Sequence, residues 1–274
     1  MSTLIYSPTS CKPAYQLRWS LSIFPQTLLP PANKWLNDLQ ASTIRDRVHT
    51  LDARPLGNNV IQFLLSTEPS ASPPDIVKSV KGRLQTILRP ELKVAYRRNF
   101  RLTSVDDASI EVVENYVAAQ LAHHRNTFTT APTKIESIQY EDNFVDLNTP
   151  INSAHGQYLI ALHIVLVHAE RFRIGDLKFL CLTKDSILRH AAENQHRISR
   201  LAILPDHVHF TLGVGYGQSA CEIVLSYMNQ VAAAHGGLRL WMDSFYVGTI
   251  GPYDMGAVRK GLGVNRSPHR PGSE

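Results

Sequence analysis

The sequence predicts an α+β protein built from two similar units in tandem, each a mostly antiparallel sheet backed by helices. Alternating apolar runs, typical of strands, are separated by segments whose apolar residues recur at helical spacing. The order of these segments then repeats: Asn59 corresponds to His207, Asp75 to Glu222 and Phe100 to Phe245. The nearly constant shift of about 145 residues between these pairs indicates a duplicated unit.

In the first half, three strands and three helices are expected. The strands cover 14–24, 59–66 and 96–105, and the helices cover 34–51, 74–88 and 108–124. The helix over 34–51 is inferred from apolar residues at helical spacing, and Pro74 is typical of the first turn of a helix.

The second half repeats this order after a stretch with little periodicity. Residues 125–156 are rich in Thr, Asn, Pro and Ser and are interpreted as a linker. Strands are then expected at 157–167, 198–204, 207–214 and 245–251, with helices at 176–194 and 219–235. The predicted domains are therefore 1–124 and 157–274, joined by 125–156.

Composition narrows the class of protein. The net charge of +5 permits nucleic-acid binding without requiring it. The three cysteines are widely spaced, which indicates reduced thiols in a cytoplasmic protein. No apolar run reaches the length of a membrane span, and the N-terminus lacks the layout of a secretory signal. Phosphate-loop, dinucleotide-binding and nucleophile-elbow motifs are absent from the sequence.

The stretch Pro205-Asp206-His207-Val208-His209 carries the clearest chemical signal. Residues two apart in a strand share a face, so His207 and His209 point the same way. Two imidazoles can hold one divalent ion when a third ligand arrives from elsewhere. The alternative is a half-buried strand with two hydrogen-bonded histidines.

This stretch, the loop and helix that follow it, Trp241 and the run 245–251 resemble the single-tyrosine HUH transposases. That family includes small insertion-sequence transposases and REP-associated tyrosine transposases. In the first half, 76–83 is similar to the helix after the family's HUH strand, and Tyr116-Val-Ala-Ala-Gln120 is similar to its Tyr-x-x-x-Gln helix. The resemblance implies ferredoxin-like HUH domains that act as dimers on single-stranded or hairpin DNA.

The resemblance also implies a site and a reaction. His207, His209 and Gln120 would bind Mg²⁺ or Mn²⁺, with Asp206 as a possible additional ligand. The Tyr116 hydroxyl would attack a DNA phosphate and form a 5′-phosphotyrosine. Independently of the family, Tyr116 and Gln120 stand four residues apart and would share one face of a helix.

Each half lacks what the other retains. The first half has Asn58-Asn59-Val60-Ile61 where the second has 206–209, so it has no histidine pair. In the second half, the counterpart of the tyrosine helix falls in the Gly-rich segment 255–264. We therefore expect a single-chain pseudo-dimer with one composite site, and an inert second site around Asn59 and Ile61. Tyr253 is the fallback nucleophile.

Basic and aromatic residues suggest how DNA could be held. The candidate phosphate contacts are Lys78, Lys81, Arg83, Arg97 and Arg98. The alternative is that these charges simply form a solvated face of the protein. The candidate base-stacking residues are Tyr96, Phe100, Tyr246 and Trp241. The alternative is that these aromatic side chains pack in the hydrophobic core. The tail 259–274 is expected to be disordered.

Three functions compete on these observations. The first is a metal-dependent DNA nickase and strand transferase. The second is a domesticated relative that binds hairpin or single-stranded DNA without cleaving it. The third is an unrelated α+β metalloenzyme that uses His207 and His209. Proximity of Tyr116 to the histidine pair would favour the first, and wide separation the second.

Overall fold

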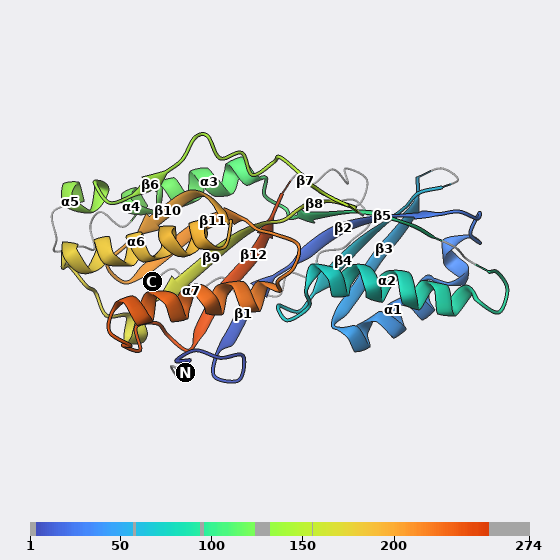
Figure 1. The fold of residues 1–274 in the computed structure, drawn as a ribbon, viewed down its shortest axis with the longest axis horizontal. Helices are drawn as coiled ribbons and strands as arrows, with labels where there is room; N and C mark the ends of the chain where they lie inside the picture. The colour runs from blue at the N-terminus through green and yellow to red at the C-terminus, as the bar shows by residue number, and fades with distance from the viewer. Residues whose placement is uncertain (1–3, 57–58, 94–95, 124–131, 155, 252–274) are drawn as a thin grey trace.

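Two six-stranded mixed sheets, lying side by side along the long axis of the molecule, form the framework of the protein (Figure 1). The structure is a computed structural model that describes residues 4–56, 59–93, 96–123, 132–154 and 156–251. Helices back both sheets, which confirms the predicted α+β class.

The first sheet has the strand order β3-β4-β2-β5-β8-β7. Its strands are β2 (Arg18–Pro25), β3 (Val48–Pro55), β4 (Ile61–Thr67), β5 (Tyr96–Val105), β7 (Ile151–Ser153) and β8 (Gly156–Leu159). Neighbours are antiparallel except β5 and β8, which are parallel. Helices α1 (Leu36–Thr43) and α2 (Pro73–Leu88) lie against one face (Figure 1).

The second sheet has the order β1-β12-β9-β11-β10-β6. Its strands are β1 (Lys12–Gln16), β6 (Tyr140–Glu141), β9 (Ala161–Val167), β10 (Arg197–Ile203), β11 (His207–Gly213) and β12 (Ser244–Ile250). Only the edge strand β1 runs parallel to its neighbour among the described pairings. Helices α6 (Leu177–Glu193) and α7 (Ala220–Ala234) cover one face, and α3 (Ile110–Ala118) covers the other. The short helices α4 (Gln120–His123) and α5 (Pro132–Glu136) follow α3.

The two units have the same topology. Each runs strand, helix, strand, strand, helix, strand, and the central orders β3-β4-β2-β5 and β10-β11-β9-β12 correspond. This is the ferredoxin-like arrangement, present twice. Even the helix starts match, because α2 and α7 both begin with a capping box, Ser72 with Asp75 and Ser219 with Glu222. The structure thus shows the duplication that the repeat predicted.

Strands exchanged between the units interlock the two sheets. A single residue, Leu17, separates β1 in the second sheet from β2 in the first. In the same way, Ile160 separates β8 in the first sheet from β9 in the second. Each unit therefore lends the start of its first strand to the other. The segment 125–156, expected as a linker, contributes β6 to the second sheet and β7 to the first.

Two buried hydroxyls join the chain where the sheets meet. Ser104 at the end of β5 donates to the Ile250 carbonyl (2.7 Å) and accepts from the Ala161 N–H (3.0 Å). Thr249 in β12 donates to the Val105 carbonyl (3.0 Å) and accepts from the Arg18 N–H (2.9 Å). The two sets of contacts are pseudo-symmetric, and both side chains are fully buried.

Two predicted helices differ from the structure. The helix expected over 34–51 ends at Thr43, and Val48 to Leu51 belong to β3, because Arg47 adopts a left-handed conformation (φ 62°) that reverses the chain. Val48 had matched the helical spacing although it is a buried strand residue. The helix expected over 108–124 is interrupted at Ala119, between α3 and α4.

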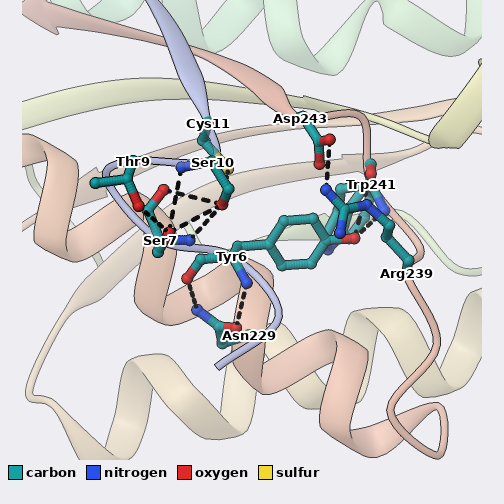
Figure 2. Close-up of polar contacts among 9 residues, drawn as sticks. All are labelled: Tyr6, Ser7, Thr9, Ser10, Cys11, Asn229, Arg239, Trp241 and Asp243. Atoms are coloured by element: carbon teal, nitrogen blue, oxygen red, sulfur yellow. Dashed lines mark hydrogen bonds and ion pairs between the residues drawn. The ribbon is translucent and has the colours of Figure 1, made fainter. Parts of the chain in front are cut away.

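The N-terminal segment is anchored on the second unit by Tyr6 and Asn229 (Figure 2). The Asn229 amide accepts from the Tyr6 N–H (2.9 Å) and donates to the Tyr6 carbonyl (2.8 Å). The buried Tyr6 hydroxyl accepts from the Trp241 N–H at 2.6 Å. Trp241 is itself 1% exposed, so it belongs to the core and does not stack on bases. Phe100 is also buried and stacks on Tyr216.

None of the described helices is both long and apolar enough to cross a bilayer. The Gly-rich segment 255–264, Tyr253 and the tail 259–274 lie outside the described residues.

The junction hydroxyls should contribute measurably to stability. Thr249→Val keeps the shape of the side chain but leaves the Arg18 N–H without its acceptor. We expect the free energy of unfolding in urea to fall by about 1–3 kcal/mol, and Ser104→Ala to behave alike. The exposed Thr86, whose hydroxyl bonds within its own helix, provides the control Thr86→Ala. A loss no larger than the control's would contradict this role.

Stability should also fall in mild acid because of His196. This buried side chain bonds the Tyr227 hydroxyl at 2.9 Å, and burial, with His190 nearby, lowers the pKa of His196 to about 4. The unfolded chain takes up the proton below a pKa near 6.5, so stability decreases as pH falls from 6.5 towards 4. His196 alone should account for a loss on the order of 2 kcal/mol at pH 5 relative to pH 7.5. His163, whose pKa burial also lowers to about 4, adds to the total loss.

Urea unfolding at the two pH values measures this loss. His196→Gln should reduce the pH dependence by that amount, whereas the exposed His123→Gln should not. Equal pH dependence in wild type and His196→Gln would show that another group is responsible.

Candidate functional site

His207 and His209 share the face of β11 that α3 covers. The alternate residues Val208 and Phe210 point to the other face of the sheet. There the Phe210 ring lies 5.1 Å from the ring of Tyr227 on α7. The ring centroids of His207 and His209 are 5.0 Å apart. His209 is buried and His207 is partly exposed. The period of two read from the sequence therefore places the pair as expected.

Tyr116 comes from the first half and lies against this pair. It stands on α3, which leaves the first sheet after β5 and packs on β10 and β11 of the second. Ile110, Val113 and Val117 form the buried face of α3, and they pack in one cluster with Ala202, Leu204 and Ile250. Tyr116 is consequently 48% exposed, and its ring lies 5.8 Å from that of His209. The structure thus brings together two residues from opposite halves of the chain.

Gln120 lies one turn beyond Tyr116 but is buried, at 3% exposure. Its amide nitrogen donates to the Tyr116 carbonyl at 3.2 Å. The helix is interrupted at Ala119, so Gln120 begins α4.

Asp206 holds His207 by a hydrogen bond. Nδ1 of His207 donates to the Asp206 carboxylate at 2.7 Å. The loop that carries Asp206 is fixed in turn by His168, whose backbone N–H donates to the Asp206 carbonyl (2.8 Å) and whose Nδ1 lies 2.9 Å from the Pro205 carbonyl. Asp206 therefore orients the His207 imidazole, and its role as an additional ligand stays a prediction.

His163 of β9 is part of the cluster, a role that its sequence pattern did not predict. A hydrogen bond joins Nε2 of His163 and Nδ1 of His209 at 3.1 Å. Burial lowers the pKa of His163 to about 4, so the ring is neutral at pH 7. The signal in the sequence was weak, because β9 and β11 are separated by a helix and a strand and their register cannot be read from spacing. An imidazole at the centre of an otherwise apolar strand was the one available indication.

Tyr246 of β12 forms the next wall of the site. Its ring lies 5.8 Å from the His163 ring, and burial raises the pKa of Tyr246 to about 12. The ring lies along its own strand over Gly248, where an added Cβ would come within 2.6 Å of the Tyr246 hydroxyl. Gly248 is also the register partner of His163. The absence of a side chain at 248 therefore lets Tyr246 reach the histidine.

The two histidines suit a divalent ion with imidazole ligands. The Asp206 bond leaves the His207 proton on Nδ1, the tautomer in which Nε2 carries the lone pair. Metal-binding histidines almost always donate their other ring N–H to a carboxylate, a backbone carbonyl or water. Within the described part of the chain, however, no cluster of three His, Cys, Asp or Glu side chains has the arrangement of a metal site. A bound ion would therefore need oxygen ligands, which an amide, water or a DNA phosphate supplies.

Among the described residues of the first unit, the corresponding position holds no such cluster. The pairing of β4 with β2 places Gln62, not Ile61, at the position equivalent to His209, and Ser20 at the position of His163. Ile61 is buried in the core under the helices, which corrects the alignment expected from the sequence. Gln62 donates to the Ser20 hydroxyl at 2.7 Å. The hydrogen bond across the strands is kept, but the imidazoles are absent.

The predicted DNA contacts divide into paired and exposed groups. Arg83 forms a bidentate ion pair with Asp46 (2.7 and 2.9 Å), and the Lys81 ammonium donates to the carbonyls of Arg97, Arg98 and Asn99. These two charges have partners inside the fold. Lys78 is exposed and lines an open groove of about 570 Å³. Other residues that line this groove include Arg45, Arg47, Ser70, Arg83 and Thr86. The side chains of Arg97 and Arg98 are exposed at the start of β5.

Comparison with known proteins adds distant structural likenesses. No protein-family model and no curated protein sequence matches the chain. A candidate transposase from Deinococcus radiodurans is 16% identical over 39% of this chain and 92% of its own, with a TM-score of 0.30. A REP-associated tyrosine transposase bound to a REP hairpin is 14% identical over 38% of this chain, with a TM-score of 0.29. The match covers 62% of that transposase, which is less than two thirds of its length. Function is therefore inferred from the site itself.

The contact between Gly248 and Tyr246 can be tested by a double-mutant cycle. Gly248→Ala should lower the free energy of unfolding by about 1–3 kcal/mol, because the methyl group collides with the Tyr246 hydroxyl. In a Tyr246→Phe background the nearest ring atom is 3.2 Å away, so the cost of Gly248→Ala should shrink. Equal costs in both backgrounds would mean that the hydroxyl does not set the constraint. Gly215→Ala, in open space, is the control.

Proposed function

We propose that the chain is a single-stranded DNA nickase and strand transferase with one composite active site. The observation that carries the proposal is the approach of Tyr116 to His209 across the two halves of the chain. The sequence resemblance to the single-tyrosine HUH transposases points to the same pair of residues. A protein that only binds DNA does not need a half-exposed tyrosine beside an oriented imidazole pair.

In the proposed reaction, the Tyr116 hydroxyl oxygen attacks a DNA phosphorus atom. A tyrosine–phosphorus bond forms, and the bond from phosphorus to the 3′ oxygen of the preceding nucleotide breaks. The phenol loses its proton to solvent and the leaving oxygen gains one, which produces a 3′-hydroxyl and a 5′-phosphotyrosine. Attack by a 3′-hydroxyl reverses the step and joins strands. No nucleotide cofactor is required, because the phosphotyrosine keeps the energy of the broken diester.

The other residues of the site position these groups. His207 and His209 would hold Mg²⁺ or Mn²⁺, with the Gln120 amide as a further ligand if it leaves the Tyr116 carbonyl. Such an ion neutralises charge on the phosphate and polarises it. Asp206 keeps the His207 ring in place, and the apolar face of α3 keeps Tyr116 above β11. The exposed Lys78, Arg97 and Arg98 would contact the phosphates of a DNA strand or hairpin.

A non-cleaving DNA binder is the second candidate. Two observations favour it: the first unit has no histidine at the corresponding position, and the Gln120 amide is bonded to the Tyr116 carbonyl of α3. A chain that had lost cleavage would keep the basic surface and the duplicated platform.

Formation of a covalent DNA adduct decides between the two. Labelled single-stranded DNA, with and without hairpins, is incubated with the protein and Mn²⁺ and analysed on a denaturing gel. We expect an adduct that Tyr116→Phe reduces on the order of a thousandfold or more, since the variant lacks the attacking oxygen, while DNA binding is retained. Chelation of the metal should have the same effect on the adduct.

Tyr15→Phe is the matched control, because Tyr15 is 46% exposed and lies on β1 in the same sheet. It should leave the adduct unchanged. An adduct that persists in Tyr116→Phe would refute the assigned nucleophile. Salt-sensitive DNA binding with no adduct in the wild type would establish the non-cleaving binder.

A further inference from the structure

Both candidate ligand histidines are held at Nδ1 by a neighbouring side chain. The Asp206 carboxylate lies 2.7 Å from Nδ1 of His207, and Nε2 of His163 lies 3.1 Å from Nδ1 of His209. A neutral imidazole has one N–H and one lone pair, so a proton on Nδ1 leaves the lone pair on Nε2. Both contacts are thus made at Nδ1, the nitrogen that does not face a bound ion in this arrangement.

The Asp206–His207 and His163–His209 contacts differ in how they fix the tautomer of the histidine. An ionised carboxylate accepts hydrogen bonds only, so the proton of neutral His207 is placed on Nδ1. An imidazole partner can donate or accept, so His163 decides which nitrogen of His209 carries its proton. If Nε2 of His163 carried the hydrogen, His209 would present a lone pair to β9 and an N–H on its other side. It could then bind no cation through Nε2.

His163 is held rigidly enough to make this choice. It lies on β9, between β11 and β12, with Thr211 and Gly248 as register partners. The Tyr246 ring packs against it edge to face at 5.8 Å, which the missing side chain at Gly248 permits. The Tyr116 ring lies edge-on at 6.1 Å. A ring confined in this way on a central strand has little freedom to rotate.

We propose that His163 is a positioning residue that accepts a hydrogen bond from Nδ1–H of His209 and thereby keeps Nε2 of His209 available to a divalent ion. The inference rests on the proposed function insofar as His209 is a ligand there. The first unit supports it by contrast: its Ser20–Gln62 bond joins the same strand positions without any imidazole. A hydrogen bond between the strands alone therefore does not require two histidines.

Two variants of His163 separate positioning from packing. His163→Leu removes the acceptor and fills much of the space, whereas His163→Gln retains an acceptor that reaches the position of Nε2. Two-dimensional ¹H–¹⁵N NMR of the imidazoles reports the tautomer of His209 in the metal-free protein. Electron paramagnetic resonance of Mn²⁺ titrated into the protein reports metal affinity without DNA or turnover.

We expect His209 to carry its proton on Nδ1 in the wild type and in His163→Gln, and to lose this preference in His163→Leu. Mn²⁺ affinity should fall by about 10- to 100-fold in His163→Leu and be largely restored in His163→Gln. The matched control is His190→Leu, which removes another partly buried histidine with a side-chain hydrogen bond, here to Ser226. It should leave Mn²⁺ affinity unchanged.

Three outcomes would overturn the inference: a proton on Nε2 of His209 in the wild type, no Mn²⁺ binding by the wild type, or equal Mn²⁺ affinity in wild type and His163→Leu. The first needs no variant, so it applies even if His163→Leu fails to fold. DNA adduct formation by the wild type is scored separately. An adduct without dependence of Mn²⁺ affinity on His163 would reject the positioning role and keep the nickase. The reverse result would keep the positioning role and reject the nickase.

Discussion

The buried hydroxyls of Ser104 and Thr249 hold the point where the two sheets exchange strands, and the candidate site depends on that point. Each hydroxyl is carried by one sheet and bonds backbone groups of the other, so neither unit can shift without breaking these hydrogen bonds. Gly251 belongs to the same constraint, because a Cβ there would meet the Ser104 carbonyl at 2.0 Å. The helix α3 begins shortly after this junction. The packing of α3 on the second sheet then sets the position of Tyr116, and the junction holds that sheet beside the first.

Duplication followed by divergence explains the asymmetry of the two units. The backbone topology and both capping boxes are retained, because each unit must still bury its helices on its sheet. The polar side chains on the opposite faces have diverged. Where the second unit has His209 and His163, the first has Gln62 and Ser20, which preserve one hydrogen bond across the strands. Fold and chemistry have thus been kept under separate constraints in one chain.

The polar cluster on the second sheet is costly to the fold, which favours a functional reading. Three imidazoles, two phenols and a carboxylate lie on one face of a sheet whose other face is packed with apolar side chains. Burial disfavours charge on His163, as its lowered pKa shows, and raises the pKa of Tyr246. Apolar residues would pack there at lower cost. In return for this cost, the rings confine one another, and their orientations in the site are fixed.

The sequence by itself determined the α+β class, the duplication, the face shared by His207 and His209, and the helix that carries Tyr116, because these follow from periodicity and repeat spacing along the chain. It misplaced the end of the helix after 34, since the reversal at Arg47 depends on one left-handed residue. Only the tertiary structure decided the strand exchange, the register that aligns His209 with Gln62, and the inclusion of His163 and Tyr246 in the cluster. These depend on pairing between strands far apart in the chain, which a local pattern does not encode. The meeting of Tyr116 with His209 was predicted from complementary loss, but its geometry comes from the packing of α3 on the second sheet.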